Sequence, residues 1–116
     1  MPVLISSLGE DNQEKVVELC SKFDIVYVIS EIPKVPEFVK ASVLIMPDAS
    51  AKELSDALHP ELKSLLSKEK ILELDIAVSM ISGSGKLHAA IMSAVMKLGY
   101  GIRLVDLDEK GNIVEL

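Results

Sequence analysis

The stretch IAVSMISGSGKLHAAI, residues 76–91, decides the fold class of this chain. An apolar run typical of a buried strand ends at Ser82, and a helix-forming run begins at Lys86. Residues 83–85 between them, Gly-Ser-Gly, are small, so the backbone can turn sharply and approach a ligand closely. A strand, a tight turn and a helix in this order are typical of an α/β protein.

The turn before this helix predicts an anion site. The first N–H groups of a helix have no partner within it, and the aligned peptide dipoles add partial positive charge there, so a phosphate is the natural guest. Lys86 lies in the first helical turn, where its charge opposes the dipole, and this indicates a role in binding. The alternative is a tight turn that binds nothing, because a helix N-terminus does not need a ligand.

Two well-known nucleotide motifs are not met. In the P-loop pattern G-x-x-x-x-G-K-[ST], Met80 stands at the first Gly and Leu87 at the Ser/Thr, so magnesium-nucleotide chemistry is not indicated. The dinucleotide pattern G-x-G-x-x-G fails at His88, which stands at its third Gly.

Length and composition limit the class of protein. With 116 residues, 49% of them hydrophobic, we expect a single domain over residues 1–116. The longest apolar runs have strand length, so we expect no membrane span. A net charge of −6 argues against binding duplex nucleic acid, and two Tyr and two Phe are too few for a base-stacking platform. A local cluster of N–H groups and cations can still bind a small anion.

Cysteine and histidine usage predicts neither a metal site nor a cofactor. Cys20 has no disulfide partner, and it falls on an apolar helical stripe, so we expect it to be buried and inert. His59 and His88 have no metal-ligand spacing with each other or with Cys20. No export signal is visible at the N-terminus, so we expect a cytoplasmic protein.

Hydrophobic periodicity predicts the remaining elements. We expect strands over residues 3–6, 25–29, 41–46 and 71–81, helices over 10–23, 50–66 and 87–98, and a C-terminal hairpin over 100–116. The fold class is therefore a Rossmann-like, open, mostly parallel sheet with helices on both faces and an antiparallel C-terminal β-hairpin.

Local signals predict some of the helix ends. Ser50 and Glu53 match a capping box at the start of the second helix, and Gly99 caps the third. Pro60 is expected to kink or split the second helix near His59. Methionines such as Met96 are expected to pack in the core.

Ligands of open parallel sheets bind beyond the carboxyl ends of the strands. Two of the predicted loops at that edge are rich in Ser and Gly, and they face one another if the first strand is central. Ser7 either orients a ligand or caps the following helix, and His88 is either a general acid or a helix residue without a role. The candidate binding residues are Ser6, Ser7, Gly9, Ser82, Gly83, Ser84, Gly85 and Lys86.

The turn Ser7-Leu8-Gly9 and the stretch MISGSGK, residues 80–86, resemble the two motif regions of the CRISPR-associated Rossmann fold (CARF) domains. This family senses cyclic oligoadenylates, and some members cleave the ring. Its Thr-Leu-Gly type and Asp-x-Thr-Gly-Gly-Thr-Lys type turns follow the first and fourth strands, and its layout matches the whole chain in outline. The resemblance implies that Lys86 contacts a phosphate and that Ser82 supplies a hydroxyl.

The chain departs from the family pattern in ways that favour binding over cleavage. Met80 stands where an Asp is usual, and Gly85 where a Thr is usual. Glu10 and Asp11 fall where ring-cleaving relatives tend to have hydroxyl residues, and their charge repels phosphate.

The resemblance implies a standalone homodimer, since a two-fold axis suits a ring with two-fold symmetry. Any ring cleavage would be slow and metal-independent, with Lys86 and Ser7 as candidate catalytic residues and a ligand 2′-hydroxyl as nucleophile. The alternative is a non-enzymatic Rossmann-like module that binds another nucleotide or serves as an assembly subunit.

Overall fold

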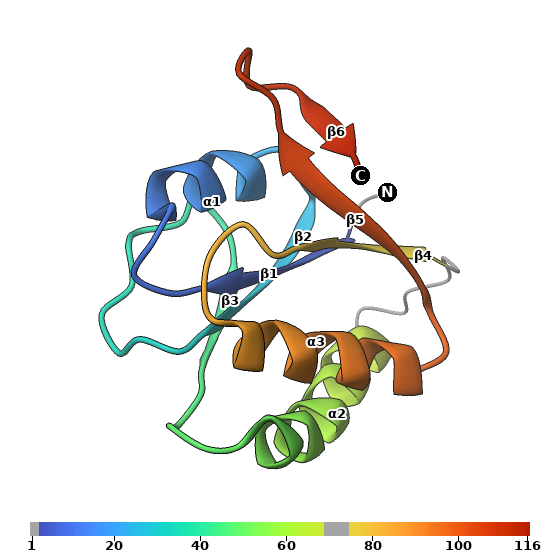
Figure 1. The fold of residues 1–116 in the computed structure, drawn as a ribbon. Coiled ribbons are helices and arrows are strands. Elements are labelled where there is room, and N and C mark those ends of the chain that lie inside the picture. The colour runs from blue at the N-terminus through green and yellow to red at the C-terminus, as the bar shows by residue number, and fades with distance from the viewer. Residues whose placement is uncertain (1–2, 69–74) are drawn as a thin grey trace.

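The computed structural model describes residues 3–68 and 75–116, which form one six-stranded sheet and three helices (Figure 1). The elements, in chain order, are β1 (Val3–Leu8), α1 (Gln13–Cys20), β2 (Ile25–Ser30), β3 (Ser42–Ile45), α2 (Ala51–Lys68), β4 (Asp75–Ser79), α3 (Gly85–Lys97), β5 (Gly101–Leu107) and β6 (Ile113–Glu115). The sheet order is β3-β2-β1-β4-β5-β6. All neighbours are parallel except β5 and β6, which form an antiparallel hairpin. The predicted fold class is confirmed.

Strand β1 lies in the middle of the parallel part of the sheet. It pairs with β2 on one side and β4 on the other, and all six of its residues are buried. The chain builds outward from β1 in one direction through β2 and β3, and in the other through β4 and β5. The switch point of the sheet, where ligands of such folds bind, is therefore at the carboxyl ends of β1 and β4.

Helices cover both faces of the sheet, with α2 and α3 on one face and α1 on the other (Figure 1). Two hydrophobic clusters result, one on each face. The α2/α3 cluster includes Val3, Ile5, Ile29, Leu58, Leu62, Ile76, Leu87 and Ile91. The α1 cluster includes Leu4, Leu8, Val16, Leu19, Cys20, Val28 and Val105.

Helix α2 begins as predicted but does not break at Pro60. The Ser50 hydroxyl accepts from the Glu53 N–H at 3.1 Å, and the Glu53 carboxylate accepts from the Ser50 N–H at 3.4 Å, so the capping box is confirmed. The helix continues through Pro60 to Lys68 as one element, so of the two expected effects, a kink or a split near His59, the split is wrong. Packing explains the difference, because buried leucines on both sides of Pro60 hold the helix against the sheet.

Other predicted boundaries and burials need correction. Strand β4 ends at Ser79, so Met80 and Ile81 belong to the turn, and residues 71–74 of the predicted strand lie outside the described residues. Strand β3 is an edge strand with no buried residue rather than a buried one. Met96 is 63% exposed and not part of the core. Within residues 3–68 and 75–116, no helix combines the length and apolar character needed to cross a membrane.

Candidate functional site

The turns after β1 and β4 are in direct backbone contact. A Cβ atom added to Gly9 would lie 2.6 Å from the Gly83 Cα and 2.7 Å from a carboxylate oxygen of Glu31. Gly83 has φ 95°, a conformation that L side chains rarely adopt. Glycine is therefore needed at both positions, at one for space and at the other for backbone geometry. The structure thus brings the two predicted loops together at the switch point.

Buried serine hydroxyls hold these turns in place. Ser82 is fully buried, and its Oγ accepts from the Gly9 N–H at 2.8 Å. Ser7 is also fully buried, and its hydroxyl faces the carbonyl oxygens of Ser79, at 3.3 Å, and Ser82. A hydroxyl has one proton to donate, and Ser7 donates it within the protein, so it neither caps α1 nor points toward solvent. The Ser6 hydroxyl is turned to the other face of β1 and bonds to the Ser7 carbonyl at 3.1 Å.

Two carboxylates of the protein already occupy part of the predicted anion site. Asp11 Oδ1 accepts from the Gly83 N–H at 2.9 Å. Glu31 accepts from the Ser84 N–H at 2.9 Å and from the Ser84 hydroxyl at 2.6 Å. The Gly83 N–H, together with weaker contributions that include the Ser82 hydroxyl, holds the pKa of Asp11 below its usual value of 3.8. The N–H groups of the turn therefore already bind two carboxylates, and both are side chains of the same chain.

The remaining donors are at the first residues of α3. Among the described residues, no group accepts from the N–H of Gly85 or Lys86. Ser84 caps the helix by accepting from the Leu87 N–H at 3.3 Å. The Lys86 ammonium lies 3.0 Å from Asp48, whose side chain is 99% exposed, and such exposed pairs contribute little. Two N–H groups and one ammonium are thus left for a ligand.

A cavity of about 370 Å³ lies beside these donors. Its volume is near the lower end of the range of about 300–1,000 Å³ for small-molecule sites, which is room for one nucleoside-sized group. Its apolar lining is supplied by the loops after β2 and β3 and by α2, and its polar rim includes Ser84 and Lys86. The lining residues are Glu31, Ile32, Met46, Pro47, Asp48, Leu54, Ser84 and Lys86.

Two further side chains, whose contacts the sequence did not predict, support the turn. His88 Nε2 lies 2.7 Å from the Ser82 carbonyl oxygen, and because a carbonyl only accepts, this nitrogen carries the proton. Asn12 donates from its side-chain amide to the Ile81 carbonyl at 2.9 Å. His88 therefore has a structural contact, which differs from both roles considered for it. His88 is four residues after Ser84 and therefore lies on the same face of α3, above the turn. This spacing is the feature of the sequence from which the contact could have been predicted.

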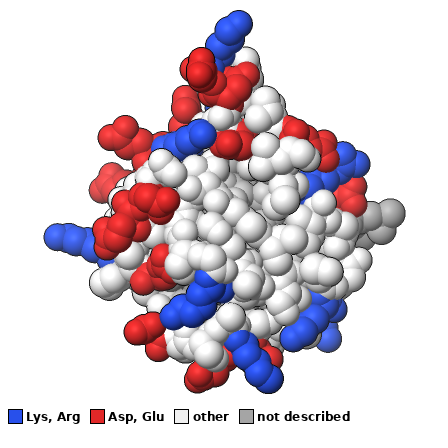
Figure 2. Space-filling model, in the orientation of Figure 1, with Lys and Arg blue, Asp and Glu red and all other residues white. Residues whose placement is uncertain are grey.

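The surface at the carboxyl ends of the strands, where the site lies, is acidic. Acidic side chains predominate along the left margin of Figure 2, the side toward which β1 points in Figure 1. Asp11, Glu31 and Asp48 contact the turn or Lys86, which is the cation beside it. An anionic ligand would therefore have to displace or neutralise some of this charge.

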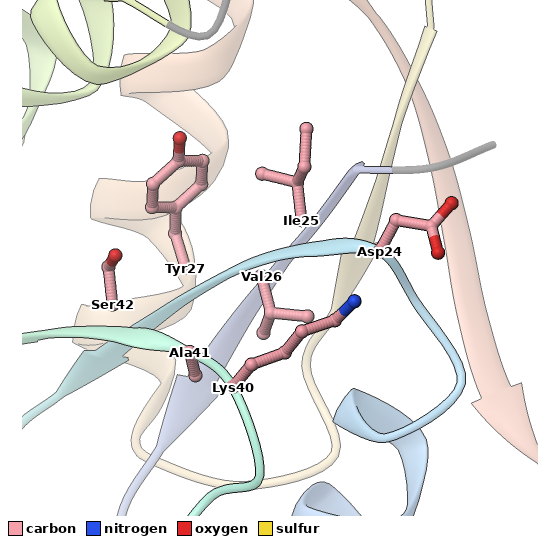
Figure 3. A pocket seen from close by; sticks show the side chains of 7 residues that line it. All are labelled: Asp24, Ile25, Val26, Tyr27, Lys40, Ala41 and Ser42. Carbon is pink, nitrogen blue, oxygen red and sulfur yellow. The ribbon is translucent and has the colours of Figure 1, made fainter.

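A second hollow, of about 420 Å³, lies at the amino ends of the strands, on the opposite side of the sheet from the candidate site (Figure 3). It is a broad groove between the starts of β2 and β3, with Tyr27 on one side and Asp24 and Lys40 on the other (Figure 3). None of the predicted site residues lines it, and the Tyr27 hydroxyl is 3.5 Å from the Leu65 carbonyl oxygen. We assign no ligand to this groove.

No group of three or more His, Cys, Asp or Glu side chains within the described ranges is arranged to hold a metal ion. No protein-family model matches this chain, and a search of characterised proteins finds no match. A functional assignment therefore depends on the residues and geometry described above.

Proposed function

We propose that the carboxyl edge of the sheet binds a cyclic oligoadenylate, with one of its phosphates at the start of α3. One observation supports this most. The joined turns leave the N–H groups of Gly85 and Lys86 and the Lys86 ammonium available beside a cavity of nucleoside size. Donors of this kind at a helix N-terminus favour a phosphate, and the motif resemblance supplies the class of ligand.

The cavity suggests how the ligand is shared between copies of the chain. It has room for one nucleoside rather than for a whole ring, and its apolar lining suits the face of a base. A homodimer would present the same turn twice, so that each copy holds one half of a two-fold ring. Light scattering at about tens of micromolar tests this, and a monomer in the presence of ligand would contradict it.

The carboxylates of Asp11 and Glu31 favour binding over cleavage. They accept hydrogen bonds from the N–H groups of Gly83 and Ser84, which are next to the N–H groups that the phosphate would use. Their negative charge therefore opposes the negative charge that builds up on the phosphate during cleavage. The Ser7 hydroxyl is buried and donates within the protein. Any cleavage would then rely on the ligand's own 2′-hydroxyl as nucleophile, with Lys86 stabilising charge on the phosphate, and it would be slow and resistant to EDTA.

Calorimetric titration of cyclic tetra-adenylate into the wild type, Lys86→Gln and Lys40→Gln tests the proposal. Lys40 lines the groove at the amino ends of the strands, away from the proposed site. Lys40→Gln removes the same charge as Lys86→Gln and is therefore the matched control. We expect Lys86→Gln to weaken binding by about 1.5–3 kcal/mol, the value of a charge-assisted hydrogen bond, and Lys40→Gln to have little effect. Equal affinities for all three proteins, or binding to none, would refute the site.

A non-enzymatic module that binds another nucleotide is the second candidate. It is favoured by the carboxylates on Gly83 and Ser84, which leave fewer donors than a multiply charged ring would use. Thermal-shift measurements with mononucleotides and cyclic oligoadenylates separate the two, since a ligand stabilises the fold in proportion to its affinity and concentration. A larger shift with a mononucleotide would favour the second candidate.

A further inference from the structure

A third cavity, of about 270 Å³, lies at the other end of α3 from Lys86. Helix α2 contributes His59, Lys63 and Ser67, which are spaced four residues apart and therefore share one face of the helix. Lys97, the last residue of α3, and Tyr100 complete the polar lining. Two lysines, a histidine, a serine and a tyrosine thus line one small cavity.

The two lysines of this cavity are weakly paired among the described residues. Lys63 makes no ion pair there. Lys97 lies 4.0 Å from Asp56, but this carboxylate is already held by Lys52 at 2.8 Å. Lys63 is therefore free to pair with an anion, and Lys97 shares its one carboxylate with Lys52.

The structure explains only part of this arrangement without a ligand. The dipole of α3 favours a cation at its last residue, and this accounts for Lys97. Lys63 lies five residues before the end of α2, where the dipole effect has faded. Figure 2 shows Lys and Arg side chains gathered where α3 ends in Figure 1. Lys63 and Lys97 line the same cavity, so an anion bound there would be attracted by both charges.

We propose that this cavity binds the phosphate group of a small phosphate monoester. Lys63 and Lys97 provide charge-assisted hydrogen bonds, and the hydroxyls of Ser67 and Tyr100 provide neutral ones. Leu66, which is 1% exposed, and Leu98 give an apolar wall for the organic part. The volume is below the range of about 300–1,000 Å³ for drug-sized ligands, so the ligand is a small molecule rather than a polymer.

The chain has two histidines, and they allow a direct test by NMR. His59 lines this cavity, and His88 contacts the turn at the start of α3. Inorganic phosphate and phenyl phosphate are titrated separately at constant pH and ionic strength, with sodium chloride as the control. We expect a saturable shift of the His59 ring signals, and tighter binding of phenyl phosphate than of inorganic phosphate because of the apolar wall.

Three variants separate this site from the one proposed above. The double variant Lys63→Gln/Lys97→Gln should weaken binding at least about tenfold, whereas Lys63→Arg should retain it and Lys86→Gln should leave it unchanged. Amide spectra show whether each variant is folded.

Three results would overturn the inference: no saturable His59 shift, equal shifts in the wild type and the double variant, or phenyl phosphate binding no more tightly than inorganic phosphate. In the first case, a shift of His88 alone would place the anion at the start of α3.

Discussion

Replacement of Gly9 by alanine tests whether the two turns are packed as one unit. The added Cβ would lie 2.6 Å from the Gly83 Cα and 3.0 Å from its nitrogen, whereas carbon atoms normally approach to about 3.5–4.0 Å. The Glu31 carboxylate, at 2.7 Å, can move because it is the end of a flexible side chain. The Gly83 backbone cannot move without disturbing the turn, so the turns must separate by about 1 Å.

The expected destabilisation follows from these contacts. Overpacking of a rigid region costs about 1–3 kcal/mol. Separation of the turns also weakens the 2.8 Å hydrogen bond from the Gly9 N–H to Ser82, which contributes about 0.5–1.5 kcal/mol. We therefore expect Gly9→Ala to lower the free energy of unfolding by about 2–4 kcal/mol, a large part of the 5–15 kcal/mol typical of a domain.

Gly85→Ala is the matched control in the same loop. A Cβ at Gly85 would meet nothing within 4 Å, and its φ is not in the left-handed region. Because Gly85 is the first residue of α3, alanine there should be neutral or stabilise the protein by up to about 1 kcal/mol.

Urea unfolding followed by far-UV circular dichroism measures both changes. The reasoning fails if Gly9→Ala is within about 0.5 kcal/mol of the wild type, the usual range for a surface substitution. It also fails if Gly85→Ala is equally destabilising, since the effect would then belong to any side chain in this loop.

Four further predictions follow from single contacts. Asp11 has a pKa below its usual 3.8 in the folded state, so its contribution to stability is present above that value and is lost as the pH falls through the lower folded pKa. Asp11→Asn should therefore be less stable than the wild type at pH 7, with a difference that shrinks below about pH 4; a constant difference in unfolding free energy would contradict this. Glu31→Gln removes a negative charge from the turn and should tighten binding of cyclic tetra-adenylate in calorimetry, so an unchanged or lower affinity counts against the site. Burial raises the pKa of the Cys20 thiol to about 12, so it should resist a thiol reagent at about pH 8 in native buffer, and fast labelling would be inconsistent with its place in the core. Pro60→Ala restores an N–H inside α2 and should raise the melting temperature, whereas a lower one would show that the proline is needed there.

Sequence patterns predicted the features that depend on neighbouring residues. The strand, turn and helix around residues 76–91 follow from an apolar run, small residues and a helix-forming run, and the structure contains all three. The capping box of Ser50 and Glu53 spans three residues, and the hairpin of β5 and β6 follows from one turn. The loops after β1 and β4 were expected to face one another if β1 is central, and it is.

Contacts between distant loops could not be predicted in this way. Asp11 reaches Gly83 across 72 residues of sequence, and Glu31 reaches Ser84 across 53. Periodicity gives the face on which a residue lies but not the partner that its side chain meets across a sheet. The position of the turn and of the helix start could be predicted from the sequence, while the carboxylates on its N–H groups became visible only in the folded chain.

The most direct test of the proposed site is an amide ¹H–¹⁵N titration with cyclic tetra-adenylate. The ligand phosphate is expected at the N–H groups of Gly85 and Lys86, next to those that Asp11 and Glu31 now occupy. We expect the largest saturable shifts at residues 83–86, with smaller ones along the cavity lined by Met46 and Leu54. Saturable binding that leaves the amides of residues 83–86 unmoved, or no binding at all, would contradict the proposal.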